Sequence, residues 1–250
     1  MLPLAATDPH PVIVQNAGSS SPYLIICDHA GRRTPAELGD LGLPPAEWER
    51  HIAYDIGAAG LSERLAAALG GACVIAQVYS RLVIDCNRDP ARPDAIVETA
   101  DGATVTGNLN LSYEARRGRV EAIHTPYHAA IAAELDARAA ARTPTSLVLI
   151  HSFTPAMGGM ARPWQVGVLH QGNALSLAAL RWLQARPELT VGDNAPYAMD
   201  DIDYTAPVHA QGRGLEYLEL ETRQDLIADA GGQDRFVELY AEMLRGIVPR

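Results

Sequence analysis

A run of four aliphatic residues at positions 147–150 leads directly into a histidine and a serine, His151 and Ser152. Proline-containing segments at 143–144 and 154–155 bound this run, which is the pattern of a short buried strand. Open α/β sheets place ligand-binding and catalytic groups at the carboxyl ends of their strands. The run therefore predicts a strand that delivers His151 to a functional site.

Two other apolar segments also end in polar side chains. Residues 23–27 lead into His29, and residues 215–221 carry Glu219 and Glu221. Because imidazole and carboxylate groups bind metal ions and transfer protons, we expect these strand ends to meet at one site.

Strand and helix signals alternate along the chain. This alternation predicts an α/β protein, a three-layer α/β/α sandwich around a mostly parallel, mixed sheet, in a single domain over residues 1–250. Strands are expected at 23–27, 73–75, 82–86, 147–150, 165–169 and 215–221, with an edge strand at 12–14. Helices are expected at 55–69 with Asp55 as N-cap, from 112 to about 123, again from 127 after an interruption at Pro126, at 177–187 and at 236–247. The long polar segments 89–111 and 188–213 are expected to be loops that shape a pocket.

Composition excludes several classes of partner. The formal net charge of −10 argues against binding to nucleic acid or an anionic membrane surface, but not against a small acidic substrate. No apolar run approaches 18 residues, and the N-terminus lacks the basic region of a signal peptide. The three cysteines, Cys27, Cys73 and Cys86, are expected to be reduced thiols in a cytoplasmic protein. No sequence signal indicates an oligomeric state.

His29 and His151 are the first candidates for metal ligands because both follow buried strands. Catalytic zinc sites take three protein ligands and a water, so a third ligand is expected, either Asp55 or Glu37. Zn²⁺ suits these ligand types, with manganese or iron as alternatives. No HExxH or CxxC spacing is present.

Glu219 and Glu221 lie on one face of an apolar strand. One interpretation places this strand at the sheet edge with its glutamates partly solvated. The other makes Glu221, which is nearer the strand end, a general base with a pKa tuned by burial.

Three arginines, Arg81, Arg88 and Arg162, are candidates to bind a substrate carboxylate or a developing oxyanion. Ser152 is adjacent to His151, but the absence of a G-x-S-x-G elbow argues against a serine hydrolase. Dinucleotide-binding and P-loop glycine motifs are absent as well.

Taken together, the motifs resemble the N-formylglutamate amidohydrolase family, whose fold is related to that of the zinc carboxypeptidases. The resemblance extends in order from about residue 25 to 225. It rests on Asp28–Gly31 with Pro35, His51, Asp55–Gly57, Ser80–Arg88, Pro126–His128, His151–Pro155, Asn194 with Pro196–Tyr197, and Glu219–Glu221.

The resemblance implies roles for individual residues. His151–Ser152 is similar to the histidine–serine pair that supplies the last zinc ligand, and Asn87–Arg88 to the pair that holds a substrate carboxylate. Glu221, with Arg223 two residues later, resembles the general base.

The first ligand motif departs from the carboxypeptidase pattern. In place of H-x-x-E, Arg32 stands three residues after His29, so Asp55 or Glu37 must replace the glutamate.

The reaction implied is metal-dependent hydrolysis of an amide, with N-formyl-L-glutamate giving formate and glutamate, as in histidine degradation. Glu221 and Glu219 would accept and donate protons. Arg81 or Arg162 would stabilise the oxyanion. The substrate would be contacted by Asn87, Arg88, Ser152 and Tyr197. One alternative is a deacylase or carboxypeptidase-like hydrolase of another N-acyl amino acid or peptide. The other is a non-catalytic metal-binding or sugar-binding protein, which would have lost the base.

Overall fold

A seven-stranded mixed sheet organises the computed structural model, which describes residues 4–199 and 203–247. The strand order is β1-β3-β2-β6-β11-β9-β10. The strands are β1 (Val12–Gln15), β2 (Tyr23–Cys27), β3 (Cys73–Gln77), β6 (Ser146–Phe153), β9 (Val166–Leu169), β10 (Val191–Asp193) and β11 (Glu216–Arg223). Most neighbouring pairs are parallel, and the antiparallel pairs are β1–β3 and β9–β11.

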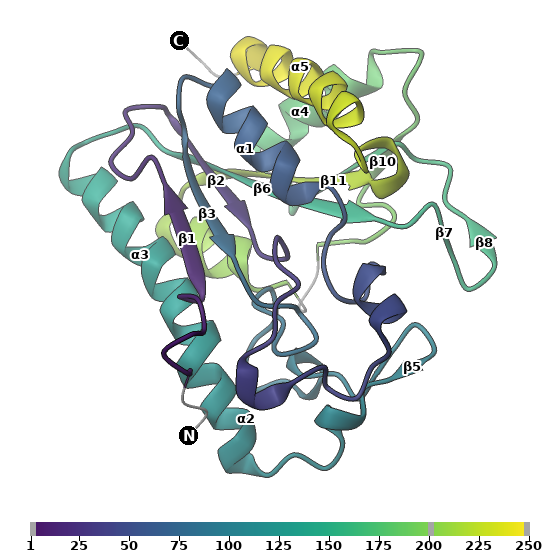
Figure 1. The fold of residues 1–250 in the computed structure, drawn as a ribbon. Coiled ribbons are helices and arrows are strands. Elements are labelled where there is room, and N and C mark those ends of the chain that lie inside the picture. Colours follow the sequence, from purple (N-terminus) through teal and green to yellow (C-terminus); the bar gives the residue numbers. More distant parts are fainter. Residues whose placement is uncertain (1–3, 200–202, 248–250) are drawn as a thin grey trace.

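Helices cover both faces of this sheet (Figure 1). They are α1 (Ala58–Ala68), α2 (Tyr113–Arg119), α3 (Thr125–Ala140), α4 (Ala174–Gln184) and α5 (Ala230–Ile247). Two small hairpins lie outside the main sheet, β4 (Thr99–Ala100) with β5 (Ala103–Thr104), and β7 (Ala156–Met157) with β8 (Met160–Ala161). The expected three-layer α/β/α architecture is confirmed.

Alternation along the strands divides the core into two clusters. In β2, Ile25 packs with α1, α4 and α5, whereas Leu24 and Ile26 pack with α3. Successive strand side chains point to opposite faces, so Asp28, one residue past β2, continues the α3 face. Leu149 and Tyr217 belong to the same α3-side cluster. His151 and Glu219 lie two residues further along their strands, so the candidate site lies on the α3 side of the sheet.

The position of β11 overturns the edge-strand interpretation. β11 pairs with β6 on one side and with β9 on the other. Glu219 is 1% exposed and Glu221 6% exposed. These carboxylates are buried in the middle of the sheet rather than solvated at its edge.

Several predicted elements are wrong in detail. Residues 82–86 form turns rather than a strand, and β10 was not predicted. Pro126 does not interrupt the helix, because a π-helical turn, η5 (Val120–His124), joins α2 directly to α3. The strand at 147–150 is longer than expected and includes His151 and Ser152.

Asp55 is not the N-cap of α1. The cap is Gly57, at a φ of 83°, which leaves the Asp55 side chain available to the site. A Cβ at Gly57 would lie 2.2 Å from the Ile227 carbonyl oxygen.

We expect Gly57→Ala to lower the free energy of unfolding by about 1–3 kcal/mol more than Gly70→Ala, because it adds a steric clash. Gly70 is the matched control, since its φ is 77° and nothing lies within 4 Å of its Cβ position. Urea unfolding of both variants measures the difference. Equal losses would show that the backbone at Gly57 relaxes freely.

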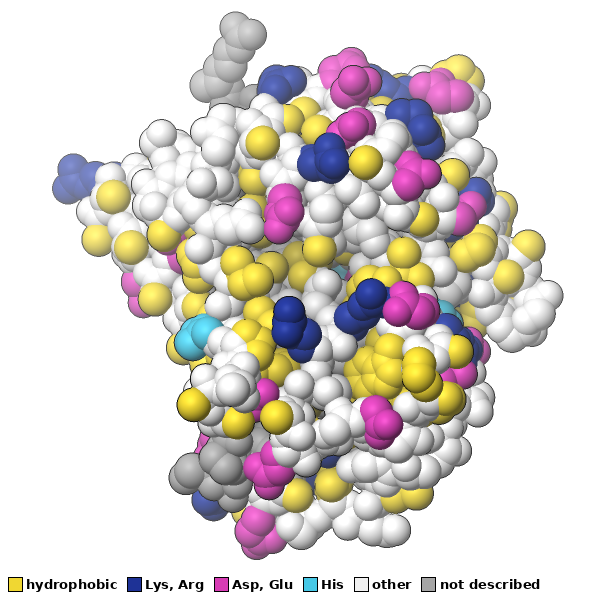
Figure 2. All heavy atoms as spheres, viewed as in Figure 1, with side chains coloured by type: hydrophobic (Ala, Val, Ile, Leu, Met, Phe, Trp, Pro, Cys, Tyr) yellow, Lys and Arg dark blue, Asp and Glu magenta, His cyan; other side chains and the backbone are white. Residues whose placement is uncertain are grey.

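No helix within the described ranges is long and apolar enough to cross a membrane. On the face seen in Figure 2, basic and acidic side chains are interspersed. This view contains no large basic patch of the kind that nucleic acid requires.

Candidate metal centre

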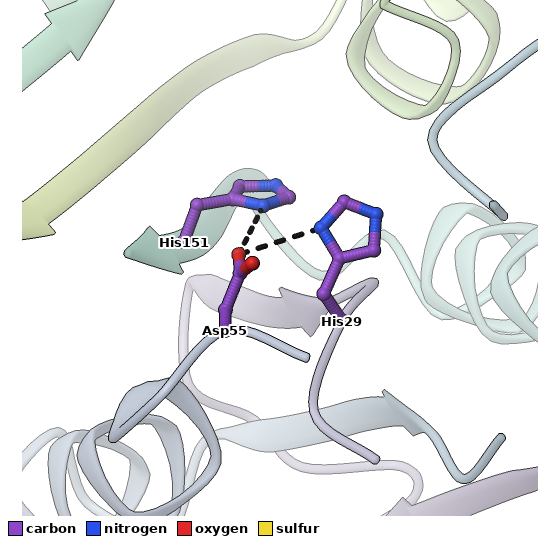
Figure 3. A group of neighbouring side chains, drawn as sticks. All are labelled: His29, Asp55 and His151. Atoms are coloured by element: carbon purple, nitrogen blue, oxygen red, sulfur yellow. Dashed lines mark hydrogen bonds and ion pairs between the residues drawn. The ribbon is translucent and has the colours of Figure 1, made fainter. Parts of the chain in front are cut away.

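Three buried side chains from different parts of the chain converge at the ends of the central strands (Figure 3). His29 follows β2, His151 lies near the end of β6, and Asp55 precedes α1. Asp55 Oδ2 lies 3.4 Å from His29 Nδ1 and 3.0 Å from His151 Nδ1. One ligand atom from each residue lies within 4.8 Å of the others.

Backbone hydrogen bonds hold Asp55 in this position. The Asp55 N–H donates to the His29 carbonyl over 2.9 Å, and the Ser152 N–H donates to Asp55 Oδ2 over 3.2 Å. Glu37, the other candidate for the third ligand, is exposed on the short helix η1 (Ala36–Leu38). The structure therefore brings Asp55, and not Glu37, to the two histidines.

Each histidine presents its second ring nitrogen to another carboxylate. His29 Nε2 lies 2.7 Å from Asp85 Oδ1, and His151 Nε2 lies 3.5 Å from Asp28 Oδ2. A carboxylate behind a histidine ligand is a common feature of metal sites, where it orients the ring and raises the basicity of the ligand. The sequence pattern alone indicates no role for Asp28 or Asp85, although Asp28 directly precedes His29 and both residues lie in the motifs that resemble the family.

The charges within this group are strongly coupled. Burial disfavours the imidazolium form of His151, but Asp28 and Asp55 outweigh it and raise the pKa of His151 well above its ordinary value. Burial also disfavours the carboxylate of Asp55, yet His29 and His151 hold the pKa of Asp55 below its ordinary value. The group thus favours positive charge beside Asp55.

The donor set fits a divalent transition metal. Two imidazoles and one carboxylate are the ligands of many catalytic zinc sites, which keep a fourth position for water. Among the described residues, His151 Nε2 and Asp28 Oδ2 are buried without a hydrogen-bond partner. Buried polar atoms usually have partners, so this unsatisfied polarity is consistent with a centre built for more than packing.

Glu219 and Glu221 complete one wall of the site. Glu221 is the register partner of His151 across the β11–β6 pair, and Glu219 Oε1 lies 3.9 Å from His151 Nε2. Burial raises the pKa of Glu221 to about 7 and raises the pKa of Glu219 well above its ordinary value. The Oε2 atoms of both have no hydrogen-bond partner in the described part of the chain. A carboxylate that is half ionised near neutral pH is suited to general base catalysis.

A cavity of about 310 Å³ opens onto this group. Its lining includes ten of the eleven site residues predicted from sequence, namely His29, Asp55, Arg81, Asn87, Arg88, His151, Ser152, Tyr197, Glu219 and Glu221. Arg162 is outside the lining, but its Nη1 donates to Tyr197 Oη over 2.9 Å and its guanidinium lies 4.8 Å from the Tyr197 ring. Parts of both long polar segments also line the cavity, namely Val97, Thr99 and Asp101 from 89–111, and Tyr197 and Ala198 from 188–213.

Arg81 contacts two carboxylates of the candidate metal centre, those of Asp55 and Asp85. Its Nη1 lies 3.3 Å from Asp55 Oδ1 and its Nη2 2.8 Å from Asp85 Oδ2. Arg88 instead donates to the Asn87 carbonyl over 2.8 Å and lies 3.8 Å from Asp94. Of the two arginines in the described cavity wall, Arg88 is therefore less engaged by carboxylates.

Two predicted substrate contacts have structural hydrogen bonds. Asn87 Oδ1 accepts from the N–H groups of Tyr204 and Thr205, at 3.0 and 2.9 Å. The Ser152 hydroxyl donates to the Ile56 carbonyl over 2.9 Å. These side chains therefore line the cavity and also hold its wall together through hydrogen bonds to the backbone.

We expect Asp85→Asn to weaken metal affinity about 10–100-fold, the range usual for loss of a carboxylate behind a histidine ligand. Competition with a chromophoric chelator measures this affinity. Asp193→Asn is the matched control, because Asp193 accepts from His170 Nε2 at 2.9 Å outside the metal group. Equal affinities in wild type and Asp85→Asn would remove Asp85 from the metal centre.

Comparison with known proteins gives a consistent picture. A family model described as N-formylglutamate amidohydrolase matches residues 21–228. The crystal structure of a gene product from Agrobacterium tumefaciens is 33% identical, with a TM-score of 0.91 over 95% of this chain and 94% of that chain.

A second solved structure is similar in fold. It is an N-formylglutamate amidohydrolase from Ralstonia eutropha JMP134, 19% identical, with a TM-score of 0.72 over 96% of this chain and 98% of that chain. No curated protein sequence matches the chain.

Proposed function

Because the chain belongs to the N-formylglutamate amidohydrolase family, we propose that it hydrolyses N-formyl-L-glutamate with a zinc ion held by His29, Asp55 and His151. The observation that carries this proposal is the position of the buried Glu221, whose Cα is the register partner of the His151 Cα and whose side chain lines the same cavity. A group of metal ligands without a base would serve binding alone. A base in register with a ligand supports hydrolysis of an amide by water.

A divalent cation bound here would polarise the scissile carbonyl and increase the acidity of water. Glu221 accepts the proton of the attacking water and later donates it to the leaving nitrogen. The C–N bond breaks, the hydroxyl group stays with the acyl carbon, and the products are formate and a free amino acid. Burial, together with the nearby Glu221, raises the pKa of Glu219, which disfavours a second negative charge beside Glu221.

The three arginines have different roles in substrate binding and charge stabilisation. Arg88 binds the substrate carboxylate at the cavity wall, where an Arg–carboxylate pair orients the substrate. Arg81 holds Asp55 and Asp85 in position and places positive charge beside the reacting carbonyl. Arg162 fixes the Tyr197 ring at the cavity rim.

The engagement of Arg81 favours a second candidate substrate class, N-acyl amino acids with an uncharged side chain. N-formyl-L-glutamate has two carboxylates, whereas Arg88 is the less engaged of the two arginines in the described wall. The wall of the cavity also contains Asp94 and Asp101, whose negative charges disfavour a second substrate carboxylate nearby.

N-formyl-L-glutamate and N-formyl-L-glutamine separate these candidates, since they differ only in the side-chain carboxylate. If glutamate is the substrate, kcat/KM for formate release should be at least about tenfold higher for the acid, in keeping with one charge-assisted hydrogen bond. A preference for the amide would assign the uncharged class. Hydrolysis of neither compound, with metal bound, would contradict both.

A further inference from the structure

Residues 82–88 form an irregular buried segment that carries Asp85, Asn87 and Arg88 into the cavity. We call it the 82–88 segment. It pairs with no strand in the described sheet, so its carbonyl groups must find other donors. Side chains distant in sequence supply them. Leu82 O accepts from Asn108 Nδ2 at 2.9 Å, Val83 O from Arg119 Nη1 at 2.9 Å, Cys86 O from His128 Nε2 at 2.9 Å and Arg88 O from His124 Nε2 at 3.0 Å.

Three of these four donors come from one continuous helical stretch, formed by α2, η5 and α3. In an α-helix, residues five apart are separated by about 140° around the axis, so Arg119 and His124 would face different directions. In a π-helical turn the hydrogen bonds join residues five apart, so two such residues lie closer to the same face than they do in an α-helix. The Thr125 N–H donates to Val120 O in this way. The π turn therefore aligns Arg119, His124 and His128 along one face, opposite the 82–88 segment.

We propose that His124 and His128 are positioning residues, which fix the backbone on both sides of Asn87 and thereby hold the Arg88 guanidinium at the cavity wall. Their hydrogen bonds go to the carbonyls of Cys86 and Arg88, the residues that flank Asn87. The role of Arg88 in binding substrate rests on the proposed function. The contacts that hold the segment do not depend on it.

A second set of bonds closes this arrangement into a ring. His128 Nε2 donates to Cys86 O, so Nδ1 of the neutral ring accepts from His209 Nε2 at 2.9 Å. His209 lies on η6 (Ala206–Ala210), and the backbone N–H groups just before η6, of Tyr204 and Thr205, donate to Asn87 Oδ1. The 82–88 segment, α3 and η6 thus hold one another.

This closed set of hydrogen bonds requires the imidazoles of His128 and His209 to be neutral. Burial lowers the pKa of His128 to about 3 and that of His209 to about 4, so both are neutral at pH 7. The His124 and His128 rings also pack together, with centroids 4.3 Å apart.

The test compares two substitutions of His128 in the zinc-loaded full chain. The Gln side chain keeps an N–H donor near the position of imidazole Nε2, whereas Leu fills similar space without one. We expect His128→Leu to raise KM for N-formyl-L-glutamate about tenfold with a smaller change in kcat. The KM of His128→Gln should lie close to the wild-type value. A role in stability alone would lower the amount of folded enzyme without separating KM from kcat. His10→Leu is the control, since His10 is exposed and its Nδ1 lies 3.1 Å from the Val12 carbonyl oxygen, outside the cavity lining.

Hydrogen–deuterium exchange provides a readout that does not depend on activity. The Asn87 N–H donates to Asp85 Oδ1 at 2.8 Å, and its exchange should accelerate in His128→Leu but not in His128→Gln. If His128→Leu does not fold, His124→Leu and His124→Gln give the same comparison at the Arg88 carbonyl. Wild-type KM and wild-type exchange in the Leu variants would overturn the proposal. If the wild-type chain hydrolyses no N-acyl amino acid, the proposed function fails, while exchange still decides whether the histidines hold the segment.

Discussion

Glu221→Gln is expected to lower kcat for formate release by about 10³-fold, within the range that a general base contributes. The substitution keeps the shape of the side chain but removes its ability to accept a proton. Burial raises the pKa of Glu221 to about 7, so the wild-type group is available as a base near neutral pH. Steady-state formate release, together with metal content, measures the effect.

Glu216→Gln is the matched control. Glu216 lies at the exposed start of the same strand, β11, and its Oε2 accepts from the Leu175 N–H at 2.8 Å. This variant should keep wild-type kcat. If Glu221→Gln also kept it with metal bound, Glu221 would not be the base, and Glu219→Gln would become the next variant to examine.

His151→Ala is expected to remove nearly all bound metal and to reduce formate release to background. The substitution leaves His29 and Asp55, which are fewer than the three protein ligands typical of catalytic zinc. It also removes the imidazole that lies 3.5 Å from the buried Asp28 carboxylate, which weakens the compensation of that negative charge. Metal content by elemental analysis and formate release are measured on the same preparation.

Zinc added back at high concentration separates ligand loss from misfolding, because a folded variant should bind it weakly. His170→Ala is the control, since His170 pairs with Asp193 outside the metal group. Stoichiometric metal in His151→Ala would mean that the ion binds elsewhere.

The central strands β2, β6 and β11, the two histidines and the candidate base could be predicted from sequence for one physical reason. A buried strand is an apolar run, and a polar residue directly after it must lie at the end of the sheet. His29 lies two residues past β2, whereas His151 and Glu221 lie within β6 and β11, each two residues before the end of its strand. Ten of the residues predicted from sequence line one cavity, and their roles stay predictions.

The failures also share a physical cause, which is that side chains distant in sequence can replace a strand partner. The apolar residues of 82–86 predict a strand, yet Asn108 and Arg119 satisfy the carbonyls of Leu82 and Val83. Pro126 predicts a break, but the π turn before it lets the helix continue. Neither compensation can be read from local periodicity.

The third ligand remained open between Asp55 and Glu37 because sequence spacing contains no distances. The bond from the Asp55 N–H to the His29 carbonyl brings the two segments together. The partners of the histidines, Asp28 and Asp85, were missed for a similar reason. Their importance follows from which ring nitrogen they face, and that appears only in three dimensions.

Elemental metal analysis of the purified protein, paired with formate release from N-formyl-L-glutamate before and after chelation, tests the central claim most directly. We expect about one zinc ion per chain, loss of formate release on chelation, and its recovery when Zn²⁺ is added. A protein that contains no metal, and gains no activity with Zn²⁺ or another divalent ion, would contradict the assignment of His29, Asp55 and His151 as a catalytic metal centre.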